Sequence, residues 1–345
     1  MNFDIKNIVR SNVLHLKPYS SARDEFQGKA EIFLDANENP FDSAYNRYPD
    51  PLQQELRDQI ATLKKIDPER LALGNGSDEI IDLLFRIFCT PGVDNVIIPQ
   101  PTYGMYKVSA AINEIEVREP LLSEGFDINE SAIKQSIDQK SKILFLCSPN
   151  NPTGNVLSVK KIEELLLYFS GIVVVDEAYI DFAESQSLTT LLDKYPNLVI
   201  LQTLSKAWGL AGLRIGIGFA SKEIVSFINK IKPPYNISSA SAQGALQAIV
   251  NTKNKNEFVQ TLIKERERME LAINNFPFVQ RVFPSQANFL LVRMDNARNC
   301  YAHLLEYGIV VRDRSNVILC EDCLRITIGT PSQNVKLLDA LKRFN

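Results

Sequence analysis

The sequence predicts an α/β protein in which helices flank a mostly parallel sheet and a second, smaller α/β domain follows. Two observations predict this fold class. Short apolar runs alternate with amphipathic, helix-like segments, which is the pattern of βαβ units. This alternation stops at Pro233 and Pro234, which form a rigid break in the chain.

The strands of the large domain are expected where apolar residues run together without polar interruption, because strands of a parallel sheet are buried on both faces. Such runs occupy residues 96–98, 143–147, 172–175, 198–201 and 215–219. Apolar residues at helical spacing predict helices over residues 77–88 and 159–169. We therefore expect a large domain over residues 46–239.

After the two prolines, a long helical pattern covers residues 240–274 and contains a polar section at 251–257. Strands are expected at residues 289–292, 309–311 and 324–328, and helices at 297–307 and 334–343. These elements predict a small carboxyl-terminal domain over residues 240–345. Residues 1–45 are irregular in pattern and are expected to form an arm that packs on the small domain.

Composition narrows the function classes. The 345 residues carry 38 basic and 41 acidic side chains, and a net charge of −3 argues against a nucleic-acid or membrane surface. No apolar run approaches the roughly 18 residues of a membrane helix, and the amino terminus lacks the pattern of a secretory signal. Five cysteines are too few for a disulfide framework in a chain of this length, so we expect a cytoplasmic protein.

A lysine and an acid carry the strongest chemical signal. Lys206 lies in a turn of small and hydroxyl residues after the apolar run 198–201, and Arg214 follows eight positions later. Asp176 ends the apolar run 172–175, and a buried carboxylate is costly unless a cation pairs with it. Pyridoxal phosphate needs a lysine for its aldehyde, an acid for its ring nitrogen and a cradle for its phosphate. Each residue alone also has an ordinary interpretation, as a loop lysine or a helix N-cap.

Three further segments supply candidates for the same site. Gly76, Ser77 and Asp78 open a predicted helix, where free backbone N–H groups favour a phosphate. Asn151 lies in a turn between two prolines after another buried strand, at the edge where open α/β sheets bind ligands. Tyr103 is a candidate to stack on an aromatic ring.

Several motifs resemble the fold-type I pyridoxal-phosphate aminotransferases and, within them, the histidinol-phosphate aminotransferase family. The resemblance runs from about residue 16 to the last predicted helix. The motifs that carry it are residues 16–19, 34–40, 47–49, 100–105, 147–154, 176–179, 203–214 and 323–330.

The resemblance implies a homodimeric transaminase of histidine biosynthesis, which uses pyridoxal 5′-phosphate and takes histidinol phosphate and glutamate or 2-oxoglutarate. Lys206 would form an imine with the cofactor, and Asp176 would pair with the ring nitrogen. Asn151 and Tyr179 would contact the ring oxygen and Tyr103 the ring face. The remaining roles fall to residues that would hold the cofactor phosphate or the substrate. The phosphate group would be held by Gly76, Ser77, Asp78, Thr203, Ser205 and Arg214, with Tyr48 reaching it from the neighbouring subunit, and the substrate by Arg325, Arg312, Tyr19 and Asn37.

Rival interpretations remain open from sequence. Cys300, His303, Cys320 and Cys323 have a spacing that mimics a zinc site, although we expect no metal, because two of them fall in a predicted helix and one opens an apolar strand. A threonine-phosphate decarboxylase or an aromatic amino-acid aminotransferase would use the same lysine and acid. A ligand-sensing domain of a transcription regulator is disfavoured, because the resemblance begins too near the start for an added DNA-binding segment.

Overall fold

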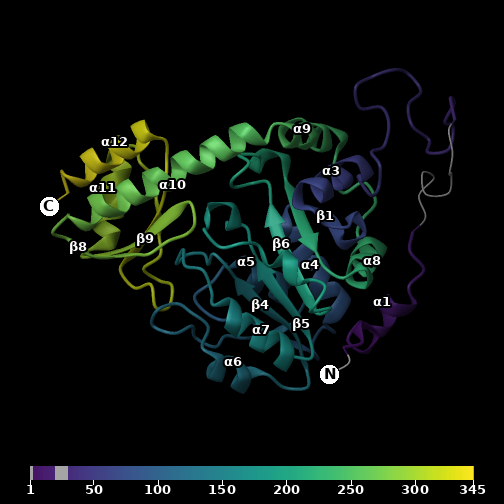
Figure 1. Cartoon of the computed structure of the whole chain (residues 1–345), viewed down its shortest axis with the longest axis horizontal. Helices are drawn as coiled ribbons and strands as arrows, with labels where there is room; N and C mark the ends of the chain where they lie inside the picture. The colour runs from purple at the N-terminus through teal and green to yellow at the C-terminus, as the bar shows by residue number, and fades with distance from the viewer. Residues whose placement is uncertain (1–2, 20–29, 345) are drawn as a thin grey trace.

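A computed structural model describes residues 3–19 and 30–344, which fold around two sheets (Figure 1). Within that part of the chain, the larger sheet has seven strands in the order β1-β7-β6-β5-β4-β2-β3. In chain order they are β1 (Leu71–Asn75), β2 (Asn95–Ile97), β3 (Glu116–Arg118), β4 (Ser141–Cys147), β5 (Ile172–Asp176), β6 (Leu198–Thr203) and β7 (Ile215–Phe219). Every neighbouring pair is parallel except those of β7, which runs antiparallel to both β1 and β6. The predicted mostly parallel sheet is confirmed.

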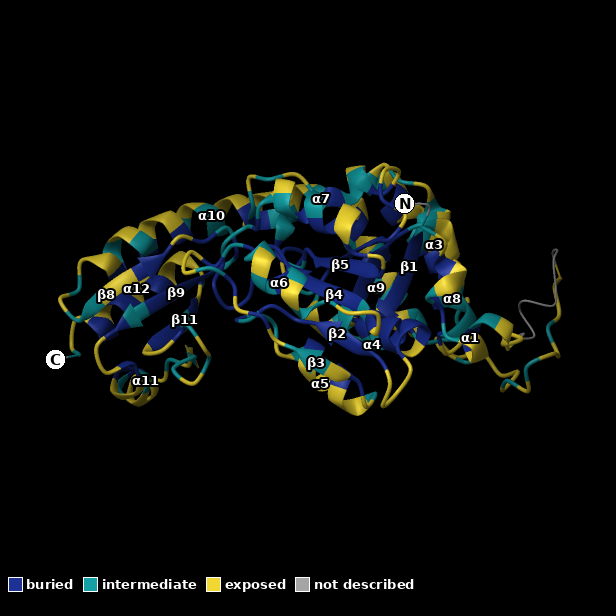
Figure 2. Ribbon diagram, turned by 90° about the horizontal axis from the view of Figure 1, so that it is seen from below, coloured by how far each residue is buried: buried dark blue, intermediate teal, exposed yellow. Residues whose placement is uncertain are grey.

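Both faces of this sheet are apolar, because successive side chains of a strand point to opposite faces. On β4, Leu144 and Leu146 join one buried cluster, whereas Ile143 and Phe145 join another. Helices cover both clusters, and Figure 2 shows the buried strands between helices whose outer sides are exposed. The first cluster is covered by α3 (Gln54–Lys64), α6 (Glu130–Ser136), α7 (Val159–Tyr168) and α9 (Ser239–Val250), and the second by α1 (Ser11–His15), α4 (Ser77–Phe88), α5 (Met105–Ile112) and α8 (Lys222–Ile231).

The smaller sheet is antiparallel throughout, in the order β10-β11-β9-β8. Its elements are α10 (Thr252–Asn274), β8 (Val279–Phe283), β9 (Phe289–Met294), α11 (Ala297–Glu306), β10 (Arg312–Asp313), β11 (Cys323–Thr327) and α12 (Pro331–Leu341). The three helices pack on one face through residues such as Met269, Leu304 and Leu337. Helix α10 runs from the large sheet to the small one (Figure 1). No helix in the described ranges is long and apolar enough to cross a bilayer.

Some elements differ from the sequence prediction. The patterns missed β1, β3 and β8, whose residues are polar in part or contain glycine, as in Gly74 of β1. The strand expected at 309–311 is instead a loop whose Ile309 and Val311 pack partly against the helices of the small sheet, and pairing begins at Arg312. The long helical tract is divided at Asn251 into α9 and α10.

The amino-terminal arm corrects another expectation. Residues 1, 2 and 20–29 of the arm lie outside the described residues. Residues 3–15 pack on the large domain rather than the small one, because Ile5, Val9 and Val13 enter the cluster beneath α4 and α8. The Arg10 backbone N–H also donates to the Ile87 carbonyl at 2.9 Å.

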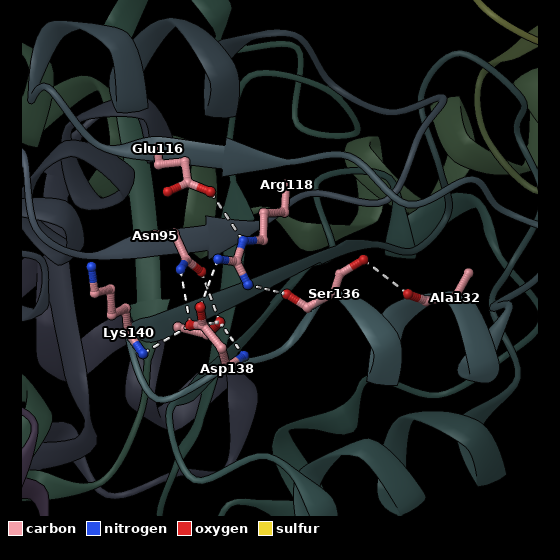
Figure 3. Close-up of polar contacts among 8 residues, drawn as sticks. Asn95, Glu116, Arg118, Ala132, Ser136, Asp138 and Lys140 are labelled. Carbon is pink, nitrogen blue, oxygen red and sulfur yellow. Dashed lines mark hydrogen bonds and ion pairs between the residues drawn. The ribbon is translucent and has the colours of Figure 1, made fainter.

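A polar cluster ties Arg118 of β3 to the start of β2 and to the turn that precedes β4 (Figure 3). The Asp138 carboxylate accepts hydrogen bonds from Asn95 Nδ2 at 3.0 Å, Arg118 Nη2 at 2.6 Å and the Lys140 backbone N–H at 2.8 Å. Arg118 also donates to the Ser136 carbonyl at 2.9 Å. The cluster therefore fixes the edge of the sheet away from the strand ends that carry Asp176 and Thr203.

Asp138 gives a pH-dependent prediction for stability. The hydrogen bond from Asn95, together with Arg118, holds the pKa of this carboxyl below its ordinary value. A carboxyl with a lower pKa in the folded state stabilises the fold above the unfolded pKa of about 3.9, and this contribution is lost as the pH falls. We expect Asp138→Asn to have a lower melting temperature than the parent at pH 6. On acidification to pH 3, the melting temperature of the variant should fall by less than that of the parent. If acidification lowers both melting temperatures equally, Asp138 does not have this role.

Candidate functional site

The site lies where several strands meet at one edge of the large sheet. The parallel strands β1, β4, β5 and β6 end there, and β7 begins there because it is reversed. Ligands of open α/β sheets bind at this carboxyl edge. A cavity of about 650 Å³ opens at the edge and is closed on the far side by residues of the small domain, among them Arg312 and Arg325.

Most of the candidate residues come together in this cavity. Its lining includes Gly76, Ser77, Asp78, Tyr103, Asn151, Asp176, Tyr179, Thr203, Ser205, Lys206, Arg214, Arg312 and Arg325. The structure does not bring Tyr19, Asn37 or Tyr48 of the same chain into the cavity lining. Tyr48 is 51% exposed and stacks on Tyr235 with ring centroids 4.5 Å apart, and Tyr19 is 73% exposed.

Asp176 is a buried carboxylate at the floor of the cavity. Its oxygens accept hydrogen bonds from the Tyr106 hydroxyl at 2.7 Å and from the Ala178 backbone N–H at 3.0 Å. No ion pair reaches it from the residues that the structure describes. Burial raises the pKa of Asp176 to about 6, and the two hydrogen bonds only partly oppose that effect. The site therefore holds a carboxylate that a cationic ring nitrogen would stabilise.

Lys206 projects into the same cavity from the loop after β6. Thr203 and Ser205 shape this loop, since the Ser205 backbone N–H donates to Thr203 Oγ1 at 3.1 Å. The Lys206 ammonium lies 5.7 Å from the centre of the Tyr179 ring. Burial, reinforced by the charge of Arg325, lowers the pKa of Lys206. A larger share of neutral amine makes this lysine a better nucleophile and base.

The start of α4 forms an anion cradle. Gly76 precedes α4 with φ +76°. The first backbone N–H groups of a helix have no partners within the helix, and no side chain caps those of α4. A Cβ on Gly216 would lie 2.1 Å from the Ser77 backbone nitrogen, so glycine lets β7 approach the helix start closely. Arg214, with one guanidinium nitrogen 3.8 Å from the Asp78 carboxylate, adds a positive charge beside the cradle.

Asn151 connects the two domains across the cavity. Its Oδ1 accepts a hydrogen bond from Arg325 Nη1, and its Nδ2 donates to the Tyr179 hydroxyl at 3.5 Å. The Arg325 guanidinium also lies over the Phe289 ring, 5.3 Å from its centre. Arg325 is thereby held with its charge toward the cavity.

Two residues at the site escaped the sequence analysis. Tyr106 is fully buried behind Asp176, in a helix whose apolar neighbours gave no sign of a hydrogen-bonding role. Arg314 lines the cavity beside Arg312 and Arg325. The sequence did contain a sign of this position. Residues two apart in an extended chain face the same side, so Arg314 is expected on the same side as Arg312.

These features fit pyridoxal 5′-phosphate. The first turn of α4 presents backbone N–H groups to a phosphate, and Lys206 offers an amine of lowered pKa for an aldehyde. In the described ranges, no ion pair neutralises the Asp176 carboxylate. The three groups line one cavity. The Asn151 amide and the Tyr179 hydroxyl also offer hydrogen-bond donors in this cavity.

The cysteine and histidine spacing does not assemble one cluster. Cys300 is buried among the helices on one side of the small sheet, whereas Cys320 and Cys323 are buried on the other side with Phe283 and Leu291. The His303 ring instead contacts the Ala340 carbonyl at 3.0 Å. Residues 3–19 and 30–344 contain no group of three His, Cys, Asp or Glu side chains that could hold a metal ion.

Comparison with known proteins gives consistent matches. The family model described as aminotransferase class I and II matches residues 29–341. The chain is 50% identical over 348 residues to a histidinol-phosphate aminotransferase of Cytophaga hutchinsonii, with 100% of each chain covered. The crystal structure of the histidinol-phosphate aminotransferase from Clostridium acetobutylicum is similar at a TM-score of 0.79 and 30% identity, covering 86% of this chain and 90% of that one. An L-threonine-O-3-phosphate decarboxylase from Porphyromonas gingivalis is also similar, at a TM-score of 0.73 and 25% identity over 86% of this chain and 90% of that one.

The buried acid predicts an unusual pH response of the cofactor-free protein. A carboxyl whose pKa is higher when folded destabilises the fold once it is ionised, so stability falls as the pH rises from about 4 to 6. At about 1.4 kcal/mol per pKa unit the penalty is a few kcal/mol. We expect Asp176→Asn to remove this fall and to melt at a higher temperature than the parent at pH 7.5. If the parent and Asp176→Asn have equal melting temperatures across this pH range, the Asp176 charge is already compensated in the cofactor-free protein.

Proposed function

The chain belongs to the aminotransferase class I and II family, and from this premise we propose that it transfers the amino group of histidinol phosphate to 2-oxoglutarate. The products are imidazole-acetol phosphate and glutamate, in histidine biosynthesis. The observation that carries the proposal is one cavity in which Lys206 and Asp176 face Arg312 and Arg325. The first pair serves amine chemistry, and the second offers positive charge for a phosphorylated substrate. Homologues that match this chain over its full length have the same named activity.

Pyridoxal phosphate supplies, when bound, an aldehyde that condenses with amines and a ring that accepts electrons from the substrate carbon. Asp176 would hold a proton on the ring nitrogen through its buried charge. The backbone N–H groups in the first turn of α4, with Thr203, Ser205 and Arg214, would hold the phosphate group. Asn151 and Tyr179 would contact the ring oxygen, and Tyr103 the ring face.

Lys206 has two roles in this scheme. Its Nζ would bind the cofactor aldehyde between turnovers. When the amino substrate is bound in its place, the free Nζ would serve as the base for the proton of the substrate Cα and would hold that proton for return. The lowered pKa favours this role, because it increases the share of neutral amine, which is the form that can accept a proton. 2-Oxoglutarate would reverse the steps, so that the two half-reactions alternate at one site.

A second subunit would complete the site. Residues 32–48 expose large side chains, with Ile32 75%, Leu34 86% and Phe41 80% exposed. A run of uncovered apolar residues marks an interaction surface. We propose that it docks on a second copy and that Tyr48 reaches the cofactor phosphate of that copy. The cysteines of the described ranges are all free and buried, which supports a reducing, cytoplasmic location.

The main alternative is a threonine-phosphate decarboxylase, since such an enzyme from Porphyromonas gingivalis has a similar fold. It would use the same lysine and acid. A spectral titration separates the candidates. We expect histidinol phosphate and glutamate to bleach the visible band of the bound cofactor, whereas threonine phosphate and phenylalanine have weak effects. Release of carbon dioxide from threonine phosphate, with no response to glutamate, would favour the decarboxylase.

Removing the lysine tests the chemical step. We expect Lys206→Ala to lower turnover of histidinol phosphate by at least about 10³-fold, because general acid–base catalysis alone contributes about 10² to 10⁴. The matched control is Lys222→Ala, a surface lysine paired with Asp67 and Glu69. The control should keep parental turnover, and retained turnover in Lys206→Ala would refute the assigned role.

Mixed dimers test whether Tyr48 serves the neighbouring site. We expect Tyr48→Ala and Lys206→Ala homodimers to be impaired for different reasons. A hybrid of the two contains one site that combines an intact Lys206 with an intact Tyr48 from the other subunit. Activity of the purified hybrid should therefore exceed that of either parent homodimer. Absence of this recovery would place Tyr48 outside the partner's site.

A further inference from the structure

A group of three arginines faces the substrate side of the cavity, and only two of them were expected there. Arg314 lines the cavity together with Arg312 and Arg325. The pairing of β10 with β11 explains why they converge. Arg312 lies directly opposite Arg325, and the Arg314 backbone N–H continues the pairing to the Cys323 carbonyl at 2.9 Å. Since residues two apart share a face and paired residues face the same side, all three side chains project together.

Among the residues that the structure describes, no carboxylate forms an ion pair with Arg314 that would account for its position. Arg314 is half-buried, and its Nε is buried without a hydrogen-bond partner. The Nε of Arg325 is unpartnered in the same way. Burial, and then the nearby charges of Arg325 and Arg312, lower the pKa of Arg314. Two half-buried guanidiniums without carboxylate partners are costly unless a ligand supplies the negative charge.

The charge of the ligand distinguishes between the two substrates of the reaction. A carboxylate carries one negative charge and is satisfied by one bidentate guanidinium. A phosphate monoester carries about −1.5 to −2 at pH 7 and has three acceptor oxygens. Three converging guanidiniums therefore suit a phosphate better than a carboxylate.

We propose that Arg314 is a third substrate-binding guanidinium that contacts the phosphate of the amino donor and selects it over dicarboxylates. This inference rests on the proposed function, because it takes the phosphorylated amine as substrate. Arg325, held by Asn151 and Phe289, serves both substrates. Arg314 serves the phosphate alone.

The test compares three substrates in Arg314→Gln, measured on the holoenzyme. A lost hydrogen bond to a charged group costs about 10- to 100-fold in binding. We expect kcat/KM for histidinol phosphate to fall by that factor, while values for histidinol, which lacks the phosphate, and for glutamate change less than about threefold. The visible band of the bound cofactor should be unchanged, which shows that the variant is folded and loaded. Arg314→Lys should recover part of the loss, because it keeps the charge.

The matched control is Arg298→Gln. Arg298 donates to Asn316 at 2.6 Å and so touches the same loop from outside the cavity. Arg298→Gln should leave kcat/KM for all three substrates unchanged. Equal losses of Arg314→Gln on all three substrates, or no loss on histidinol phosphate, would overturn the inference while the proposed function stands. Failure of the parent enzyme to use histidinol phosphate would instead reject both.

Discussion

The burial of one carboxylate sets the requirements that the rest of the site meets. Asp176 ends a strand that is covered on both faces, and its hydrogen bonds to Tyr106 and Ala178 do not neutralise its charge. In the cofactor-free protein burial makes this charge costly and raises the pKa of Asp176. A cationic ring nitrogen would convert this cost into binding energy and would keep the ring able to accept electrons. That interaction would link the stability of the fold to cofactor affinity and to the chemistry.

The reversed strand β7 brings Arg214 to the same edge of the sheet as Asp176 and Thr203. Were it parallel, its beginning would lie at the opposite edge of the sheet, away from Asp176 and Thr203. Because it is antiparallel, Arg214 and the close contact at Gly216 lie beside the start of α4. The anion cradle at the start of α4 is therefore built from residues far apart in the chain, Gly76 and Arg214.

Positive charge is divided between the two domains. Arg214 lies on the large domain beside the cradle, and Arg312, Arg314 and Arg325 lie on the small domain across the cavity. The hydrogen bond between Arg325 and Asn151 is a direct polar contact between these halves. A phosphorylated substrate and a phosphorylated cofactor can thus occupy one cavity with separate sets of cations.

The sequence by itself determined the fold class and the inner strands, because burial on both faces of a sheet imposes apolar runs. It also determined the helix Ser77–Phe88, because the apolar residues there recur at helical spacing. It also predicted which short motifs would meet at the sheet edge, since their turns follow buried strands. Only the tertiary structure decided three other features: the order and direction of the strands, the packing of residues 3–15 on the large domain, and the positions of side chains such as Tyr106 and Arg314 beside the cavity. Asp176 and Glu177 show the reason. They are adjacent acids in the chain, yet one faces the cavity and the other is enclosed by Ser187 and Gln202. Which way each points depends on residues far away in the sequence, which local pattern cannot report.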